Sequence, residues 1–240
     1  MSTRRIPALC VLLLGLSLAC APSPSAQGGN QAPEPPPRKP AKVLNAEGGG
    51  AEWLEREGRA DLEKPEVTIA AMNLHDGDMV ADVGAGTGFY SRRLARAVAP
   101  SGKVYANDIQ PEMLERLKEL SAQEGIANIV PVLGTETDLN LPEKTFDWVL
   151  LVDVYHEFQQ PDVMLQQIRK TLKPNGRVAL VEYRLEGSTA SHISLEHRMS
   201  VEQVTAEWTA GGFELERTIE DLPSQHLFIL TTRRGARAMP

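Results

Sequence analysis

The chain has 240 residues, a formal net charge of −7 and an isoelectric point near 5.3. This acidic balance argues against a nucleic-acid-binding surface, which normally carries clustered Lys and Arg. Both cysteines, Cys10 and Cys20, lie near the N-terminus, so the rest of the chain contains no disulfide, thiol nucleophile or cysteine metal site.

The first twenty residues have the layout of an export signal. Arg4 and Arg5 precede the apolar stretch Ile6 to Leu18, which is the charge and hydropathy order of secretory signals. The segment from Leu16 to Cys20 resembles the lipobox of bacterial lipoproteins, and this resemblance implies lipidation of Cys20. We therefore expect residues 1–20 to be a lipoprotein-type signal peptide. The alternative is an ordinary cleaved signal, which would leave a soluble periplasmic protein.

Residues 21–45 form a predicted tether between this signal and a single domain at residues 46–240. Five prolines lie between positions 33 and 40, and such a segment cannot bury enough apolar surface to fold. We expect an exported protein of the bacterial cell envelope that contacts the membrane only through its N-terminal lipid anchor. No later segment is long and apolar enough to span a bilayer.

Helical spacing of apolar residues begins near Ala51 and predicts two short helices before the first strand. We expect these helices to cover a ligand cleft. Four charged residues on them are either pocket residues or a solvated face, and the solvated face is the preferred interpretation. They are Glu55, Arg56, Glu57 and Arg59.

A glycine-spaced turn follows the first predicted strand, Met79 to Val83. Gly84, Gly86 and Gly88 favour positive φ and close approach of a ligand to the backbone, and a helix is predicted from Thr87 to Val98. Phe89 stands where the dinucleotide fingerprint requires its third glycine. The pattern therefore matches a pyrophosphate-binding site only in part.

Two acidic residues define the expected ligand more closely. Asp82 places a carboxylate beside a helix N-terminus that dinucleotide enzymes reserve for phosphate, and this charge suits a ligand with an ammonium group. Asp108 ends the second predicted strand, Lys103 to Asp108, where a carboxylate commonly binds the hydroxyls of a ribose. A ribose with an amino-acid end and no pyrophosphate describes S-adenosylmethionine (SAM).

Strands and helices alternate along the rest of the chain. The alternation predicts an α/β fold with a doubly wound, mostly parallel seven-stranded sheet and an antiparallel closing strand. The further predicted strands are Ile129 to Leu133, Phe146 to Val152, Arg177 to Glu182, Phe213 to Ile219 and His226 to Thr232. The further predicted helices are Pro111 to Ala122, Val163 to Leu172 and Val201 to Ala210.

Several of these segments resemble the motifs of the class I, Rossmann-like SAM-dependent methyltransferases. The first motif of that family resembles Asp82 to Gly88, and Asp108 resembles its second-strand acid. The resemblance implies a cofactor site that also includes Ala85, Ile109 and Asp153. Thr135 stands where many members carry an adenine-binding acid, so Glu136 or Asp138 is an alternative adenine contact.

Candidate catalytic residues follow the fourth predicted strand, because ligands of open α/β sheets bind at the carboxyl ends of strands. His156 is the predicted general base, since an imidazole near its ordinary pKa accepts a proton at neutral pH. The alternative for His156 is a hydrogen bond to Glu157 or to its own helix. Tyr155 is a second candidate, for which packing is the preferred alternative.

Other kinds of chemistry lack their sequence patterns. No metal site is predicted, because His156, Glu157, His192, Glu196 and His197 show no established ligand spacing. No Gly-x-Ser-x-Gly segment supports a serine hydrolase.

The predicted function is methyl transfer from SAM to a small-molecule acceptor. Two alternatives remain open at this point. The first is a non-catalytic envelope lipoprotein that keeps the fold, because an exported domain would lie where SAM is not expected. The second is a nucleotide-dependent oxidoreductase, which Asp82 and Phe89 disfavour.

Overall fold

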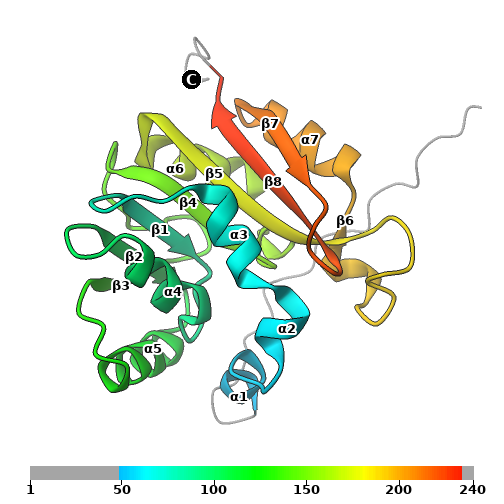
Figure 1. Cartoon of the computed structure of the whole chain (residues 1–240). Helices are drawn as coiled ribbons and strands as arrows, with labels where there is room; N and C mark the ends of the chain where they lie inside the picture. The colour runs from blue at the N-terminus through cyan, green and yellow to red at the C-terminus, as the bar shows by residue number, and fades with distance from the viewer. Residues whose placement is uncertain (1–48, 234–240) are drawn as a thin grey trace, which may run out of the picture. The chain divides into compact units, whose positions relative to one another are not determined.

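The computed structural model describes residues 49–233, in which eight strands form one sheet flanked by helices (Figure 1). The strands are β1 Met79–Val83, β2 Lys103–Asp108, β3 Ile129–Leu133, β4 Phe146–Val152, β5 Leu172–Arg184, β6 Arg198–Met199, β7 Phe213–Ile219 and β8 Gln225–Thr232. The α-helices are α1 Gly50–Leu54, α2 Arg59–Glu63, α3 Pro65–Met72, α4 Phe89–Ala97, α5 Pro111–Gln123, α6 Pro161–Thr171 and α7 Val201–Ala210. Two 3₁₀ turns bear on the site, η2 Tyr155–Glu157 and η3 Leu195–His197. The predicted signal peptide and tether lie outside the described residues.

The sheet has the predicted doubly wound, mostly parallel form. Its strand order is β3-β2-β1-β4-β5-β8-β7, with β6 paired to β5 at the side. Pairs among β1 to β6 are parallel, whereas β8 is antiparallel to both of its neighbours. The seven-stranded path with an antiparallel closing strand confirms the predicted fold, and the two-residue β6 is an addition to it.

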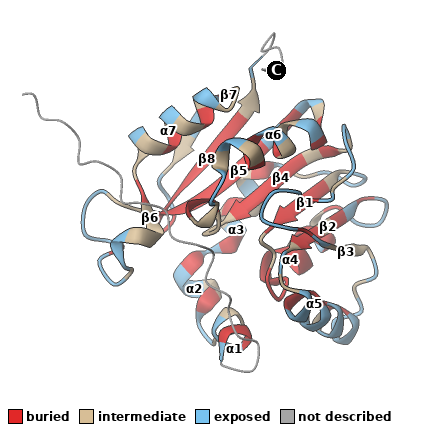
Figure 2. Ribbon diagram, turned by 180° about the vertical axis from the view of Figure 1, so that it is seen from behind, coloured by how far each residue is buried: buried red, intermediate tan, exposed pale blue. Residues whose placement is uncertain are grey.

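Two apolar clusters cover the two faces of the sheet. Alternate residues of β4 point to opposite faces, so Val149 and Leu151 belong to one cluster and Trp148 and Leu150 to the other. Helices α6 and α7 pack on the first face, and α3 and α4 on the second (Figures 1 and 2). Because both faces are covered, the central strands are continuous apolar runs, which made them easy to predict.

The carboxyl ends of three strands meet at one edge of the sheet. Val83 of β1 pairs with Asn107 of β2 on one side and with Leu151 of β4 on the other. The strand order therefore reverses at β1, and open α/β sheets bind ligands at such a switch point. This edge is where the candidate site lies.

Several predicted elements differ from the structure. Helix α6 is Pro161–Thr171 instead of Val163 to Leu172, and one end each of α5 and β8 differs by one residue. The segment before β1 forms three helices instead of two. Helix α4 begins at Phe89 instead of Thr87, because Gly88 adopts a left-handed φ of 84° that ends the glycine turn. Strand β5 is longer than predicted because Leu172 already pairs with Phe146, ahead of a bulge.

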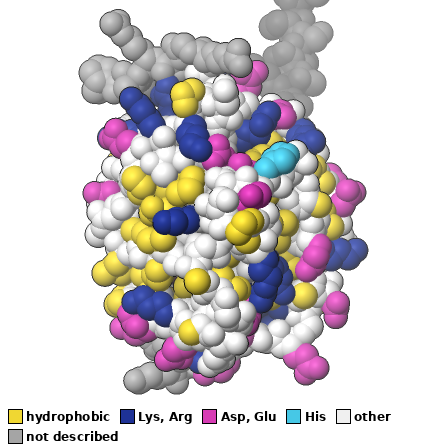
Figure 3. Space-filling view, turned by 60° about the vertical axis from the view of Figure 1, so that its left-hand side comes forward, with side chains coloured by type: hydrophobic (Ala, Val, Ile, Leu, Met, Phe, Trp, Pro, Cys, Tyr) yellow, Lys and Arg dark blue, Asp and Glu magenta, His cyan; other side chains and the backbone are white. Residues whose placement is uncertain are grey.

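Figure 3 shows acidic and basic side chains interspersed among apolar ones over one face of the molecule. Among residues 49–233, no helix combines the length and the apolar character that a membrane crossing requires.

Two leucines on helices test the assignment of the core. Leu94 of α4 is fully buried, whereas Leu62 of α2 is 61% exposed. We expect Leu94→Ala to lower the free energy of unfolding by about 2 to 5 kcal/mol, because a cavity replaces the lost side chain. The matched Leu62→Ala should change it by less than about 0.5 kcal/mol. Urea denaturation of both variants measures the difference, and equal losses would contradict the core assignment.

Candidate active site

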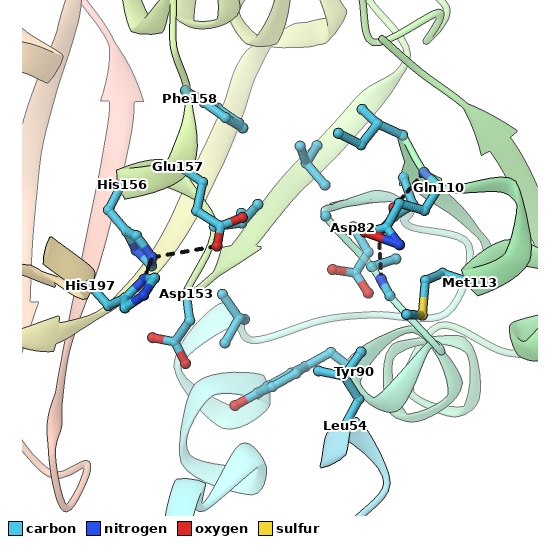
Figure 4. Close-up of a pocket in the computed structure, with 18 of the residues that line it drawn as sticks. Leu54, Asp82, Tyr90, Gln110, Met113, Asp153, His156, Glu157, Phe158 and His197 are labelled. Carbon is cyan, nitrogen blue, oxygen red and sulfur yellow. Dashed lines mark hydrogen bonds and ion pairs between the residues drawn. The ribbon is translucent and has the colours of Figure 1, made fainter. Parts of the chain in front are cut away.

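A cavity of about 530 Å³ opens at the carboxyl ends of β1, β2 and β4. Its volume is in the range of small-molecule sites. In Figure 4, Asp82, Gln110 and Met113 lie on one side of this cavity, and His156, Glu157 and His197 lie on the other.

Most of the predicted site residues line this cavity, although their individual roles stay predictions. The residues that line it are Asp82, Gly84, Ala85, Gly86, Asp108, Ile109, Thr135, Glu136, Asp153 and His156. Gly88 and Tyr155 were also predicted but are not among the lining residues.

The glycine turn is shaped by close contacts that exclude side chains. Gly84 has a φ of 72°, and a Cβ added there would lie 2.5 Å from a methyl carbon of Val154. Gly86 has a φ of 54°, and its Cβ would lie 2.8 Å from Leu54. Both positions therefore favour glycine, and both residues line the cavity.

Asp108 connects the glycine turn to the end of β2. Its Oδ2 accepts a hydrogen bond from the Gly86 N–H at 2.8 Å, and its Oδ1 accepts one from the Gln110 N–H at 2.9 Å. Burial raises the pKa of the Asp108 carboxyl, although these backbone donors act in the opposite direction. A carboxylate has about four lone-pair sites, so Asp108 can accept further hydrogen bonds from a ligand.

Asp82 is a buried carboxyl at the end of β1. The Ser91 hydroxyl donates a hydrogen bond to its Oδ2 at 2.6 Å. Burial raises the pKa of Asp82 to about 6, more than this hydrogen bond and Arg59 lower it. A cationic group in the cavity would stabilise the charged form of Asp82.

Gly88 has a packing role instead of the predicted cofactor contact. It precedes α4 with a φ of 84°, and a Cβ there would lie 2.7 Å from Leu117 of α5. The sequence motif could not separate glycines that face the ligand from one that lets two helices approach.

In the loop after β3, the Thr135 side chain already takes part in a local hydrogen bond. The Thr135 Oγ1 accepts a hydrogen bond from the Asp138 N–H at 2.9 Å, and the Thr135 N–H donates to the Asp138 carbonyl at 2.7 Å. This closed turn uses the Thr135 hydroxyl, whereas Glu136 is exposed and lines the cavity. Of the two predicted alternatives, Asp138 is not among the lining residues.

Asp153 carries a strained backbone and an unsatisfied carboxyl. Its φ is 51°, which is uncommon for a residue with a side chain. Its Oδ2 accepts a hydrogen bond from the Gln225 amide at 2.7 Å, but its buried Oδ1 has no hydrogen-bond partner. Burial and, next, the charge of Glu182 raise the pKa of Asp153 well above its ordinary value.

His156 is held by a residue that the sequence did not connect to it. Its Nδ1 lies 2.6 Å from the Oε2 of Glu182, and its Nε2 lies 2.9 Å from the Nδ1 of His197. Glu182 is fully buried, and its Oε1 also accepts a hydrogen bond from the Tyr155 N–H at 2.8 Å. Because this carboxylate contacts both Tyr155 and His156, it orients η2.

The sequence predicts an ordinary pKa for His156, and this prediction is wrong. Burial lowers this pKa, but the charge and hydrogen bond of Glu182 outweigh burial and raise it to about 9. At neutral pH the proton therefore stays on the imidazole, which weakens its suitability as a general base.

Tyr155 is a core residue instead of a catalytic one. Its side chain is fully buried, and its hydroxyl donates to the Oε2 of Glu207 at 2.7 Å. Its ring packs against Trp208 and Phe158, with centroids 5.1 and 5.6 Å away. The structure therefore agrees with the preferred alternative for Tyr155, which is a packing role.

The helices before β1 contribute residues that the sequence left on a solvated face. Arg59 is only 8% exposed, lines the cavity and donates from its Nε to Glu63 at 2.9 Å. Glu55 pairs with Arg92 at 2.8 Å and accepts a hydrogen bond from the Thr87 hydroxyl at 2.6 Å. The solvated-face interpretation was therefore wrong for Arg59, which is buried, and for Glu55, which contacts Arg92 of α4 and Thr87 of the glycine turn.

Comparisons with known proteins agree with this geometry. The family model described as "Methyltransferase domain" matches residues 74–222. The chain is similar to a demethylmenaquinone methyltransferase of Geobacillus sp. (strain WCH70), with 30% identity over 52% of this chain and 53% of the relative. It is also similar to the ubiquinone/menaquinone biosynthesis C-methyltransferase UbiE of Burkholderia multivorans, with 32% identity over 48% of this chain and 47% of the relative. The chain thus spans about half the length of these curated relatives.

A solved structure covers more of the chain. A SAM-dependent methyltransferase from Aquifex aeolicus is 26% identical, with a TM-score of 0.69, over 75% of this chain and 95% of that chain. This similarity confirms the predicted class I methyltransferase fold.

Two glycines with similar backbones test the shape of the glycine turn. Gly84 and Gly58 have φ values of 72° and 77°, but a Cβ at Gly58 would have no atom within 4 Å. Both alanine variants carry the strain of a left-handed residue, and only Gly84→Ala adds the clash with Val154. We expect Gly84→Ala to be less stable than Gly58→Ala by about 1 to 3 kcal/mol in urea denaturation. Equal stabilities would contradict the crowding described for the turn.

Proposed function

This chain belongs to the methyltransferase-domain family, and from that membership we propose that it transfers a methyl group from SAM to a small-molecule acceptor. The observation that carries the proposal is the convergence of three features on one cavity. These are the Asp82 carboxyl, the glycine turn at Gly84 and Gly86, and the Asp108 carboxyl. Together they suit a ligand with an ammonium group and a ribose.

The cavity residues fit SAM on observations of this structure. The glycine turn is a surface that a Cβ would distort, so its backbone can lie against the cofactor. Asp82 is a buried carboxyl that a ligand ammonium would stabilise, and Asp108 retains capacity to accept ribose hydroxyls. Arg59 is a buried cation that also lines the cavity and suits a ligand carboxylate.

In this reaction the protein mainly aligns the methyl donor with the acceptor. SAM supplies a methyl group that is already activated on a sulfonium. Holding two reactants in line can contribute about 7 to 11 kcal/mol toward lowering the barrier. The wall formed by His156, Tyr183 and His197 is the proposed acceptor side of the cavity.

The two alternative functions are not favoured. A nucleotide-dependent oxidoreductase does not fit the family or the buried Asp82 carboxyl. A non-catalytic protein would have little reason to keep ten predicted site residues on one cavity.

We also propose that residues 1–20 direct export and that Cys20 carries a lipid anchor. The support is the sequence alone, with the arginine pair, the apolar stretch and Ala19-Cys20 in the order of a lipoprotein signal. The proline-rich residues 21–45 would then hold the domain away from the membrane.

Calorimetric titration of the chain with SAM, S-adenosylhomocysteine and NAD tests the proposed cofactor. We expect micromolar affinity for the first two, on the order of 8 kcal/mol, and much weaker binding of NAD. Asp108→Ala should weaken SAM binding at least about tenfold, because it removes a charged hydrogen-bond acceptor. The control is Asp162→Ala, which removes an exposed acid that does not line the cavity. Equal affinity for NAD, or unchanged SAM binding by Asp108→Ala, would overturn the proposal.

Expression in a bacterial host tests the proposed anchor. The full chain should enter the membrane fraction and change in mass by cleavage before Cys20 and addition of acyl chains. Cys20→Ser should abolish acylation, whereas Cys10→Ser, the matched control, should not affect it. An unprocessed chain without acyl groups would contradict both export and anchoring.

A further inference from the structure

Two histidines and a glutamate meet on the acceptor side of the cavity. His156 and Glu157 come from η2, and His197 comes from η3, about forty residues later in the chain. One nitrogen or oxygen ligand atom from each residue lies within 4.8 Å of those of the other two. All three residues line the cavity (Figure 4). No ligand spacing was visible in the sequence, because His197 reaches the other two residues only through the fold.

The fully buried Glu182 fixes the orientation of this cluster. Its carboxylate accepts a hydrogen bond from the Nδ1–H of His156 at 2.6 Å, so Nε2 is the ring nitrogen that faces His197 and Glu157. Histidines that bind metals usually donate their other ring N–H to a carboxylate in this way. A metal ion that binds this Nε2 would displace the proton that it carries at neutral pH.

The charges around the cluster also favour a cation. Glu157 and Glu182 lie beside His156, and Asp153, with its buried and unsatisfied Oδ1, belongs to the same cavity wall. Buried carboxylates need a compensating positive charge, and the two imidazoles are neutral when they act as ligands.

We propose that His156, Glu157 and His197 form a binding site for a divalent cation of the zinc type. Two imidazole nitrogens and one carboxylate oxygen are a frequent donor set for catalytic zinc, which keeps a further position open. All three residues line the cavity, so an oxygen or sulfur atom of the acceptor could reach a cation held there.

This site changes the role predicted for His156. The Nε2 lone pair that coordinates a metal cannot also accept a proton, so the bound cation takes over activation of the acceptor. That role rests on the proposed methyltransferase function. The metal site itself does not, because its geometry involves only residues of this chain.

Metal titration tests the site directly. The probe is Zn²⁺, added in a calorimeter to the full chain after treatment with a chelator, and Co²⁺ in a parallel titration followed by visible absorption. Cys10→Ser and Cys20→Ser are present throughout, because thiolates also bind zinc. We expect one ion per chain, and a coordinated Co²⁺ spectrum with Zn²⁺ displacing it.

Substitutions then identify the ligands. His197→Ala and Glu157→Gln should weaken Zn²⁺ binding at least about tenfold, and Glu182→Gln should weaken it about 10- to 100-fold by removing the orienting carboxylate. His192→Ala is the matched control, since His192 lines the same cavity but lies outside the cluster, and its Zn²⁺ affinity should be unchanged.

Binding of S-adenosylhomocysteine, measured on every variant, separates this proposal from the proposed function. Retained binding by His197→Ala shows that the variant is folded. Absence of Zn²⁺ binding by the parent chain, or equal Zn²⁺ binding by parent and His197→Ala, would overturn the metal site and leave a hydrogen-bonded histidine pair. Loss of cofactor binding in the parent chain, with the zinc pattern intact, would instead overturn the methyltransferase proposal.

Discussion

The pairing of β1 with β2 on one side and β4 on the other is the constraint on which the cavity depends. It brings the ends of three strands to one edge, so Asp82, Asp108 and Asp153 lie around one space although they are far apart in the chain. The helices on both faces keep these strands in place through two apolar clusters. The positions of the acidic groups therefore follow from backbone pairing.

Such an arrangement costs stability in the absence of a ligand. Burial raises the pKa values of Asp82, Asp108 and Asp153, because a carboxylate loses its hydration there. Asp153 adds a left-handed backbone and an oxygen without a partner. Strained and poorly solvated groups persist where the surrounding structure fixes them, and they gather at functional sites. A cationic ligand would remove part of this cost.

The sequence predicted the residues whose role depends on local pattern. Strands β1, β3 and β4 are apolar runs followed by a glycine or an acidic residue, and β2 ends at Asp108, so the bounds of these strands and the cofactor side of the cavity could be predicted from the sequence. The contact between His156 and Glu182 could not be predicted in the same way. It depends on the pairing of Val152 with Val181, which sets two separate segments side by side. Arg59 was misjudged for a similar reason, since its burial is produced by packing against distant residues such as Phe89.

The placement of β8 between β5 and β7 has a consequence for biosynthesis. Strand β7 leaves the ribosome before β8, yet it has no place in the sheet until β8 has paired with β5. Until then β5 presents an open edge, which is prone to pairing with other chains. The Gln225 amide that holds Asp153 also arrives with β8. The hydrogen bond that holds Asp153 at the cavity can therefore form only after β8 has been synthesised and has paired with β5.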